Sequence, residues 1–187
     1  MIIGNDFEAI MYIRNYQKSD LKSIIFLFRE TVHSINSKDY TQEQLKIWAP
    51  ENIDEKSWHL SLLSHYTLVA IDKEKIVGFV DLDENYVDRL YVAKDYQRQK
   101  IATRLMDKIE NHAKKQGQIS LYSHVSITAK KFFLDRGYIV NKEQYVKKQN
   151  ILYKNKTLIL LIICSNISVF LTFKEMKDKP SYDSDAK

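Results

Sequence analysis

The chain has 187 residues, which is enough for one domain with a sizeable core and too few for two ordinary ones. Apolar residues make up 44% and charged residues 28%, and the formal net charge of +5 is spread over many surface lysines, as in an ordinary globular domain. With only four glycines and two prolines, long flexible linkers are not expected. Cys164 is the single cysteine, so an intrachain disulfide is excluded. The first 16 residues lack the pattern of a secretory signal, and we therefore expect the protein to be located in the cytoplasm.

The N-terminal part is expected to hold one strand followed by helices. Residues 12–16 alternate apolar and polar side chains, which predicts a strand. Asp20 lies in N-cap position before a helical apolar stripe. A capping box starts at Thr41 and predicts a short helix that Pro50 ends, and Asp54 precedes a further helix.

Three closely spaced strands come next, over residues 67–71, 76–82 and 86–92. Their short connections predict an antiparallel meander. A strongly amphipathic helix follows from Ile101 and ends near Gly117.

The remaining elements complete the predicted sheet. We expect a strand over 119–125, a helix over 129–136 closed by Gly137, and further strands, with 157–162 as the last buried one. A meander that leads into a strand–helix–strand crossover implies an α/β fold, or more closely an α+β mixed sheet, antiparallel at first and parallel at the crossover.

The loop between the third strand of the meander and the amphipathic helix is the main candidate for a binding site. Free backbone N–H groups at a helix start converge on an anion, and the helix dipole adds favourable potential. Arg98, Lys100 and Arg104 add positive charge nearby. The alternative is an ordinary strand-to-helix turn with solvated basic residues.

These segments resemble the GNAT superfamily of acetyltransferases. Residues 97–102 (QRQKIA) resemble its pyrophosphate loop, Gln/Arg-x-x-Gly-x-Gly/Ala, and residues 88–92 (DRLYV) its pantetheine-binding strand. Residues 126–138 resemble its Asn/Ser-x-x-Ala-x-x-Phe-Tyr-x-x-x-Gly-Phe block, and 13–14 and 77–79 its first strand and hairpin. The resemblance covers roughly residues 11 to 150 and implies the GNAT fold, with a mostly antiparallel sheet and a parallel crossover at the cofactor site.

The resemblance also implies the co-substrate and its contacts. Acetyl-CoA would be held by the backbone of the third strand, by the pyrophosphate loop and by the later block. The implied cofactor-binding residues are Leu90, Tyr91, Val92, Gln97, Arg98, Gln99, Lys100, Ile101, Ala102, Thr103, Ser126, Ala129 and Phe133.

The sequence departs from the family pattern at two positions that concern chemistry. Lys100 replaces the first loop glycine; a lysine can adopt the right-handed helical region and contact phosphate, or it can crowd the loop. Phe133 stands where many members have a tyrosine that protonates the leaving thiolate. Ser126 and Tyr122 are the candidates to replace that acid.

A general base is also required, because a lysine-like amine has a pKa of about 10.4 and must lose a proton to attack. Alternation along the third strand predicts Asp88 on one face with Leu90, and Val87 with Arg89 on the other. A carboxylate in an apolar strand is costly to bury unless it is paired or functional, so Asp88 is the predicted base or amine anchor. The alternative is a structural ion pair with Arg89, Arg136 or a lysine.

The C-terminal part is expected to leave the family pattern. We expect a GNAT domain over residues 11–162 and an atypical extension over 163–187, partly apolar and then disordered. The apolar run 157–173 is barely long enough to cross a membrane, so a membrane tail anchor is kept only as an alternative. The histidines show no metal-ligand spacing with Cys164, and no metal is predicted.

Together these observations predict an N-acyltransferase that moves an acetyl group from acetyl-CoA to a primary amine by direct attack in a ternary complex. The acceptor is a small-molecule or peptide amine, nucleic acid and membrane are not expected partners, and the protein is a monomer or a homodimer. The alternative is a non-catalytic acyl-CoA-binding sensor or interaction module, which the changes at Lys100 and Phe133 motivate.

Overall fold

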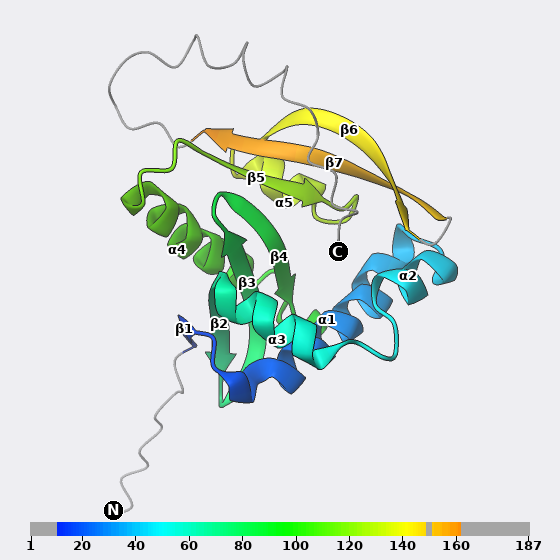
Figure 1. Cartoon of the computed structure of the whole chain (residues 1–187), viewed down its shortest axis with the longest axis horizontal. Helices are drawn as coiled ribbons and strands as arrows, with labels where there is room; N and C mark the ends of the chain where they lie inside the picture. Colours follow the sequence, from blue (N-terminus) through cyan, green and yellow to red (C-terminus); the bar gives the residue numbers. More distant parts are fainter. Residues whose placement is uncertain (1–10, 149–150, 162–187) are drawn as a thin grey trace, which may run out of the picture.

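The computed structural model describes residues 11–148 and 151–161. These residues form one mixed α/β fold, in which helices pack against a sheet (Figure 1). In chain order its strands and main helices are β1 Tyr12–Asn15, α1 Leu21–Ile35, α2 Gln42–Trp48, α3 Glu55–Ser64, β2 Tyr66–Asp72, β3 Lys75–Asp83, β4 Tyr86–Val92, α4 Ile101–Lys115, β5 Ser120–Val125, α5 Lys130–Asp135, β6 Ile139–Lys148 and β7 Ile151–Leu161. Three single-turn 3-10 helices, Lys18–Asp20, Asn36–Lys38 and Lys94–Tyr96, lie between them.

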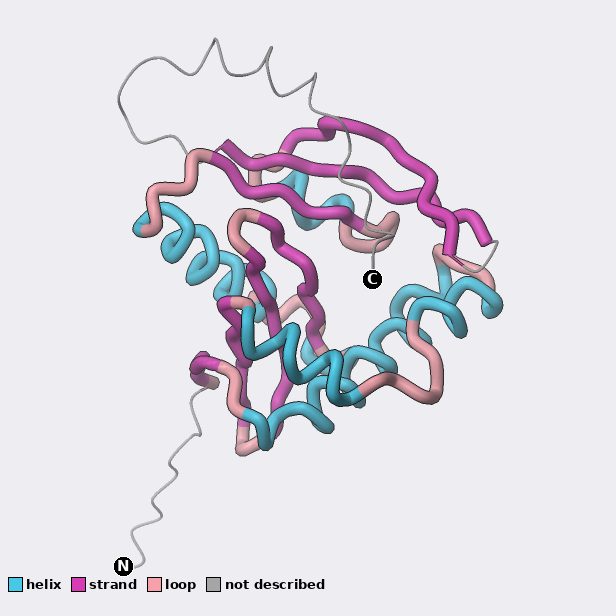
Figure 2. Tube along the Cα trace, viewed as in Figure 1, coloured by secondary structure: helices cyan, strands magenta, loops and turns pink. Residues whose placement is uncertain are grey.

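The strands form one seven-stranded sheet in the order β1-β2-β3-β4-β5-β7-β6. Every neighbouring pair is antiparallel except β4 and β5, which are parallel (Figure 2). The predicted mixed sheet with a parallel crossover is therefore confirmed.

Local signals fix two of the three N-terminal helix starts as predicted. Thr41 and Gln44 form a reciprocal capping box, with backbone N–H to side-chain oxygen distances of 2.9 and 3.2 Å. Asp54 caps α3 by accepting from the N–H groups of Lys56 and Ser57. Asp20 lies at the predicted position before α1, but its carboxylate accepts instead from the backbone N–H of Gln17 and from Arg14.

Two hydrophobic cores lie on the two faces of the sheet. The first contains the buried side of α4, with Leu105, Met106 and Ile109, against β2, β3 and β4. The second lies under α1, α2 and α3 and includes Ile24 and Phe79. The start of α4 is therefore held rigidly at the end of β4, where the predicted phosphate loop lies.

Gly78 on β3 makes this close approach of α4 possible. A Cβ atom there would lie 3.1 Å from Ile101 Cγ2, 3.1 Å from the Tyr91 carbonyl oxygen and 3.3 Å from Leu105 Cδ1. We expect Gly78→Ala to lower the free energy of unfolding by about 1–3 kcal/mol, as overpacking does, and to push the start of α4 outward. Urea unfolding measures this, and a Gly78→Ala protein as stable as the parent would contradict it.

A β-bulge interrupts β4 and changes the predicted pattern of its side chains. Asp81 pairs with Arg89 and Leu82 with Val87, so Asp88 is an extra residue without a partner on β3. Val87 consequently joins the same core as Val92, on the face opposite Arg89. The simple alternation predicted for this strand is wrong at its beginning, because the bulge shifts the period by one residue.

The last described strand is longer than expected. The predicted strand over 157–162 coincides, as far as Leu161, with the final part of β7, which pairs with β5 on one side and β6 on the other. No helix in residues 11–148 and 151–161 has the length and hydropathy needed to cross a membrane. The predicted extension, residues 163–187, lies outside the described residues.

Candidate active site

The parallel strands β4 and β5 are joined at one end only. Their ladder has a single pair, Tyr86 with Tyr122, reinforced by a hydrogen bond of 2.8 Å from Ser123 Oγ to the Val87 carbonyl. Beyond this point the two strands diverge toward their carboxyl ends, as Figure 2 shows. A parting of this kind leaves backbone groups in the middle of the sheet without a neighbouring strand.

The backbone of Leu90 and Val92 is turned into this parting. Ala93 donates its N–H to the Val77 carbonyl on β3 at 2.9 Å, so its neighbour Val92 faces the other way. Two side chains confirm this orientation, because Gln97 Nε2 at 2.7 Å and Thr31 Oγ1 at 3.4 Å donate to the Val92 carbonyl. By the same alternation Leu90 faces the parting and Tyr91 faces β3.

The predicted phosphate loop is an exposed strand-to-helix turn with free donors. The backbone N–H groups from Arg98 to Thr103 donate to no acceptor in the part of the chain that the structure describes. The side chains of Gln97, Arg98, Gln99 and Lys100 are exposed, while Ile101 is buried against Gly78. Free N–H groups at the start of α4 together with two cations form a site suited to an anion.

Lys100 adopts the left-handed conformation that glycine normally occupies. Its φ is +61° and ψ is 15°, and it is the N-cap residue of α4. The right-handed helical region, one of the two possibilities that the sequence left open for this lysine, is therefore not adopted. The turn before α4 therefore uses a conformation that favours glycine, although the lysine carries a Cβ atom.

This conformation predicts the effect of restoring glycine. A residue with a Cβ atom in the left-handed region destabilises the folded state by roughly 1–2 kcal/mol. Glycine removes this cost but gives the unfolded chain more conformational freedom, which offsets part of the gain. Lys100→Gly is therefore expected to raise the free energy of unfolding by about 1 kcal/mol. Lys100→Ala is the matched control, since it removes the same charge and keeps the Cβ atom, and it should give no gain. Equal stability of the two variants in urea unfolding would contradict the argument.

A pocket of about 460 Å³ lies beside the phosphate loop, between α4 and α5, and Thr103, Phe132, Asp135 and Arg136 line it. Arg136 already pairs with Glu110 at 2.6 Å and with Asp107 at 2.8 Å. It is therefore not the partner of Asp88 that the sequence left open. The pocket extends from the start of α4 toward α5.

The later motif lies at the carboxyl end of β5. Ser126 Oγ accepts from the Ala129 N–H at 3.2 Å and so fixes the turn into α5. Phe133 is only 3% exposed and packs edge-on against Tyr138, with ring centroids 5.0 Å apart. A direct contact of Phe133 with a cofactor, as the resemblance implied, does not fit this burial.

Tyr122 lies at the closed end of the parting, away from Ser126. Its ring is 4.9 Å from that of Tyr86, and burial raises its pKa, so the phenol keeps its proton at neutral pH. His124, two residues further along β5, is held neutral because burial lowers its pKa. Tyr122 is the third residue of β5, and Ser126 follows the last residue of that strand, so the two candidate acids lie near the closed and the wide end of the parting.

The wide end of the parting is closed by two hydrogen bonds from the α1–α2 connection, which we call the clasp. Thr128 Oγ1 donates to Asp39 Oδ2 at 2.6 Å, and the Ile127 N–H donates to Tyr40 Oη at 2.9 Å. The clasp links the turn after β5 to the N-terminal helices. The parting is therefore bounded at both ends, by the Tyr86–Tyr122 pair and by the clasp.

Asp88 lies on the bulge, and its side chain is 35% exposed. Burial in the site and the nearby charge of Asp81 raise its pKa, and Arg89 works against this shift. The Arg89 Nε lies 3.3 Å from Asp88 Oδ2, so the ion pair that the sequence left as an alternative is present. The carboxylate is thus both paired and open to the solvent side of the site.

A buried charged network, which was not predicted from the sequence, lies next to Asp88. Asp81 is fully buried and binds Arg89 Nη2 at 2.5 Å and His65 Nδ1 at 2.6 Å. Arg89 also donates to Ser61 Oγ at 2.6 Å and lies over the ring of Trp58, 5.0 Å from its centroid. The hydrogen bond to Asp81 raises the pKa of His65.

The ligand atoms of His65, Asp81 and Asp88 lie within 4.8 Å of one another, close enough to bind a cation. The guanidinium of Arg89 already serves both carboxylates as a counter-ion. The group therefore fits an ion-pair network better than a metal centre.

Comparison with known proteins identifies the family. A family model described as an acetyltransferase (GNAT) domain matches residues 36–155. The uncharacterized N-acetyltransferase YafP of Escherichia coli is 32% identical over 143 residues, which cover 76% of this chain and 91% of the relative.

Solved structures agree with this result. A GCN5-related N-acetyltransferase from Rhodopseudomonas palustris has a TM-score of 0.79 and 28% identity, and the match covers 85% of this chain and all 100% of that one. The PaiA N-acetyltransferase of Thermoplasma acidophilum, solved in complex with coenzyme A, has a TM-score of 0.64 and 18% identity, with 81% and 99% of the two chains covered, and shares the fold. The chain described here belongs to the GNAT superfamily of N-acetyltransferases.

Proposed function

We propose that the protein transfers an acetyl group from acetyl-CoA to a primary amine, which attacks the thioester directly in a ternary complex. The observation that carries the proposal is the parting of β4 and β5, which leads straight to the free N–H groups at the start of α4. An extended thioester arm that ends in a pyrophosphate matches this combination of a narrow backbone slot and an anion site.

In this proposal, different parts of the protein bind different parts of acetyl-CoA. The backbone N–H groups of Leu90 and Val92 bind the pantetheine arm, and the turn from Arg98 to Thr103 binds the pyrophosphate. The pocket of about 460 Å³ beside Thr103 receives the nucleotide end. Two structural neighbours support the assignment, because PaiA was solved with coenzyme A and YncA of Salmonella typhimurium with its cofactor acetyl-CoA.

The chemistry follows from the bulge at Asp88. The amine nitrogen forms a bond to the thioester carbonyl carbon, the carbon–sulfur bond breaks, and the amine proton passes to the Asp88 carboxylate, directly or through a water molecule. A raised pKa brings this carboxylate closer to the range in which it accepts a proton efficiently. The nearby charge of Arg89 opposes this rise in pKa and favours the ionised carboxylate.

The leaving thiolate needs little help. A thiol has a pKa of about 8.5, so its thiolate is an acceptable leaving group near neutral pH. Of the two candidate acids, Ser126 lies at the carboxyl end of β5 beside the motif that holds the cofactor in the family, and it is the one we favour. Phe133 contributes a core contact rather than a proton.

Calorimetric titration of the full chain with acetyl-CoA tests the proposal, together with a thiol-release assay over a panel of primary amines. We expect saturable binding and amine-dependent release of free thiol. Absence of heat at millimolar acetyl-CoA would remove the proposal. Binding without turnover on any amine would favour the alternative function, an acyl-CoA sensor, for which the lysine at position 100 and the phenylalanine at position 133 are the motivating observations.

We also propose that residues 11–162 form the catalytic unit. The described elements of this range make one sheet with two cores, and the family match ends within it at residue 155. A chain shortened to residue 162 is expected to bind acetyl-CoA as the full chain does, measured by the same titration.

A further inference from the structure

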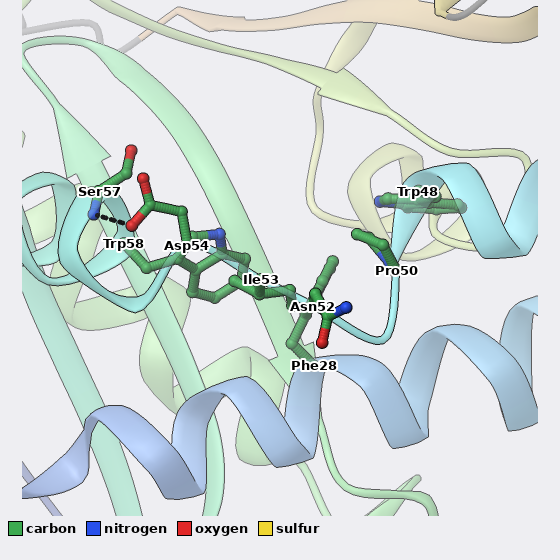
Figure 3. Close-up of a pocket in the computed structure, with 8 residues that line it drawn as sticks. All are labelled: Phe28, Trp48, Pro50, Asn52, Ile53, Asp54, Ser57 and Trp58. Atoms are coloured by element: carbon green, nitrogen blue, oxygen red, sulfur yellow. Dashed lines mark hydrogen bonds between the residues drawn. The ribbon is translucent and has the colours of Figure 1, made fainter.

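A second pocket, of about 250 Å³, lies on the N-terminal side of the molecule among α1, α2, α3 and the connection between α2 and α3 (Figure 3). Figure 3 shows Trp48 and Pro50 on one side and Trp58 with Ile53 and Phe28 on the other. The remaining lining residues are Asn52, Asp54 and Ser57.

Aromatic side chains form its walls and hold one another in place. Phe28 and Trp58 have ring centroids 4.8 Å apart, and Phe28 meets Tyr91 of β4 edge-on at 5.0 Å. Trp48 meets Tyr40 edge-on at 5.2 Å, and Tyr40 is part of the clasp. Because every ring is fixed by a neighbour, the pocket offers pre-formed flat apolar surfaces to a ligand.

The charge of the pocket favours an amine over an acid. Asp54 is the one ionisable side chain that lines it, and no basic residue does so among the described residues. One of its oxygens, Oδ1, accepts from the N–H groups of Lys56 and Ser57, which leaves the other for a ligand. Aromatic faces beside a carboxylate attract a cationic or polarised N–H group.

The pocket is connected to the proposed base. Trp58 forms its wall and also carries the guanidinium of Arg89, 5.0 Å from the ring centroid. Arg89 in turn contacts Asp88 at 3.3 Å. Trp58 and Arg89 therefore link the wall of the pocket to Asp88, the residue proposed to take the amine proton.

The size of the pocket limits the ligand. A volume of about 250 Å³ corresponds to roughly eight water molecules of about 30 Å³ each. This volume matches one ring with a short side chain, whereas an aminoglycoside or a folded peptide segment would extend beyond it.

We propose that this pocket binds the acceptor, and that the acceptor is a small primary amine on an aromatic or similarly flat apolar skeleton. The proposal rests on the acetyltransferase function proposed above and specifies its substrate class. The proposed acceptor differs from polyamines, aminoglycosides and peptide lysines, whose skeletons are flexible, strongly polar or large.

The two tryptophans of the chain give a direct test, because both of them line this pocket. Intrinsic tryptophan fluorescence of the full chain therefore reports on its occupancy without any turnover. We expect a saturable change with phenethylamine and none with spermidine, kanamycin or free lysine at the same concentrations. Trp48→Phe leaves Trp58 as the single reporter and should keep the response.

Substitutions separate the pocket from the rest of the helices. Trp48→Leu removes a wall and is expected to weaken phenethylamine binding about tenfold, which corresponds to roughly 1.4 kcal/mol. Leu60→Ala on α3 is the matched control, since Leu60 is 55% exposed and absent from the lining, and it should bind as the parent does. In the thiol-release assay Trp48→Leu should raise KM for phenethylamine and change kcat little.

The outcomes distinguish this proposal from the function on which it rests. Thiol release with spermidine or kanamycin but not with phenethylamine would overturn the substrate class and leave the acetyltransferase function standing. A fluorescence change that Leu60→Ala and Trp48→Leu affect equally would also overturn the pocket assignment. Absence of acetyl-CoA binding would overturn the proposed function, whatever the fluorescence shows.

Discussion

Asp88→Asn is expected to lower kcat/KM for the amine by about 10²–10⁴-fold at neutral pH, the usual contribution of a general base. Asparagine keeps the size of the side chain and its position on the bulge but does not accept the amine proton. The rate should be measured by thiol release with a saturating acetyl-CoA concentration. Asp83→Asn is the matched control, because Asp83 ends the neighbouring strand β3, is 58% exposed and should leave the rate within about twofold.

The pH profile gives this prediction a second readout. Because burial and the charge of Asp81 raise the pKa of Asp88, the parent rate should be low when Asp88 is protonated and rise as pH passes through this raised pKa. In Asp88→Asn this inflection should be absent, and the rate should follow the ionisation of the amine alone. A variant with nearly the parent rate and the same inflection would show that another group is the base.

Arg89→Ala is expected to lower the free energy of unfolding by about 3–5 kcal/mol, the cost of leaving a buried charge without its partner. Asp81 is fully buried and Arg89 supplies its shortest ion pair, at 2.5 Å. Urea unfolding followed by circular dichroism measures the change. The double variant Asp81→Leu, Arg89→Met should recover most of the loss, because it removes both charges and keeps apolar volume.

Because of His65, the free energy of unfolding that is lost in Arg89→Ala should depend on pH. Its pKa is raised in the folded protein, above about 6.5 in the unfolded chain, because it is hydrogen-bonded to Asp81. Protonated His65 therefore stabilises the fold fully below the unfolded pKa, and this contribution is lost as pH rises through the folded pKa. In Arg89→Ala, where His65 is the remaining cation beside Asp81, the loss should be larger at about pH 8.5 than at about pH 5.5. A loss below about 1 kcal/mol at both values would contradict the argument.

The elements were predictable where a local rule decides them. The capping box at Thr41 and the cap at Asp54 rest on contacts within four residues, so the sequence alone locates both helices. The buried stripe of α4 has a clear helical period and was equally accessible. The left-handed Lys100 was not, because its conformation is set by the packing of α4 against Gly78 and not by the lysine itself.

The bulge in β4 could have been found from charge. An unbroken hairpin that pairs Leu82 with Val87 would place Asp81 directly opposite Asp88, and two like charges in that position are destabilising. One extra residue moves Arg89 opposite Asp81 instead, which gives an ion pair and leaves Asp88 without a partner residue on β3. His65, the other partner of Asp81, could not have been found from the sequence in this way. Its contact with Asp81 depends on how the end of α3 packs against β3.

The divergence of β4 and β5 gives this sheet two internal edges in addition to those at β1 and β6. Unpaired strand edges are templates for pairing with other chains, and proteins usually protect them. Here the Tyr86–Tyr122 pair and the clasp bound the opening, while a foreign strand would need about 4.7–4.9 Å of spacing on each side to complete the ladder. A bound pantetheine arm would take the place of the missing strand. The coenzyme-free protein is thus the form most exposed to self-association, and coenzyme binding would protect the middle of the sheet as well as deliver the acetyl group.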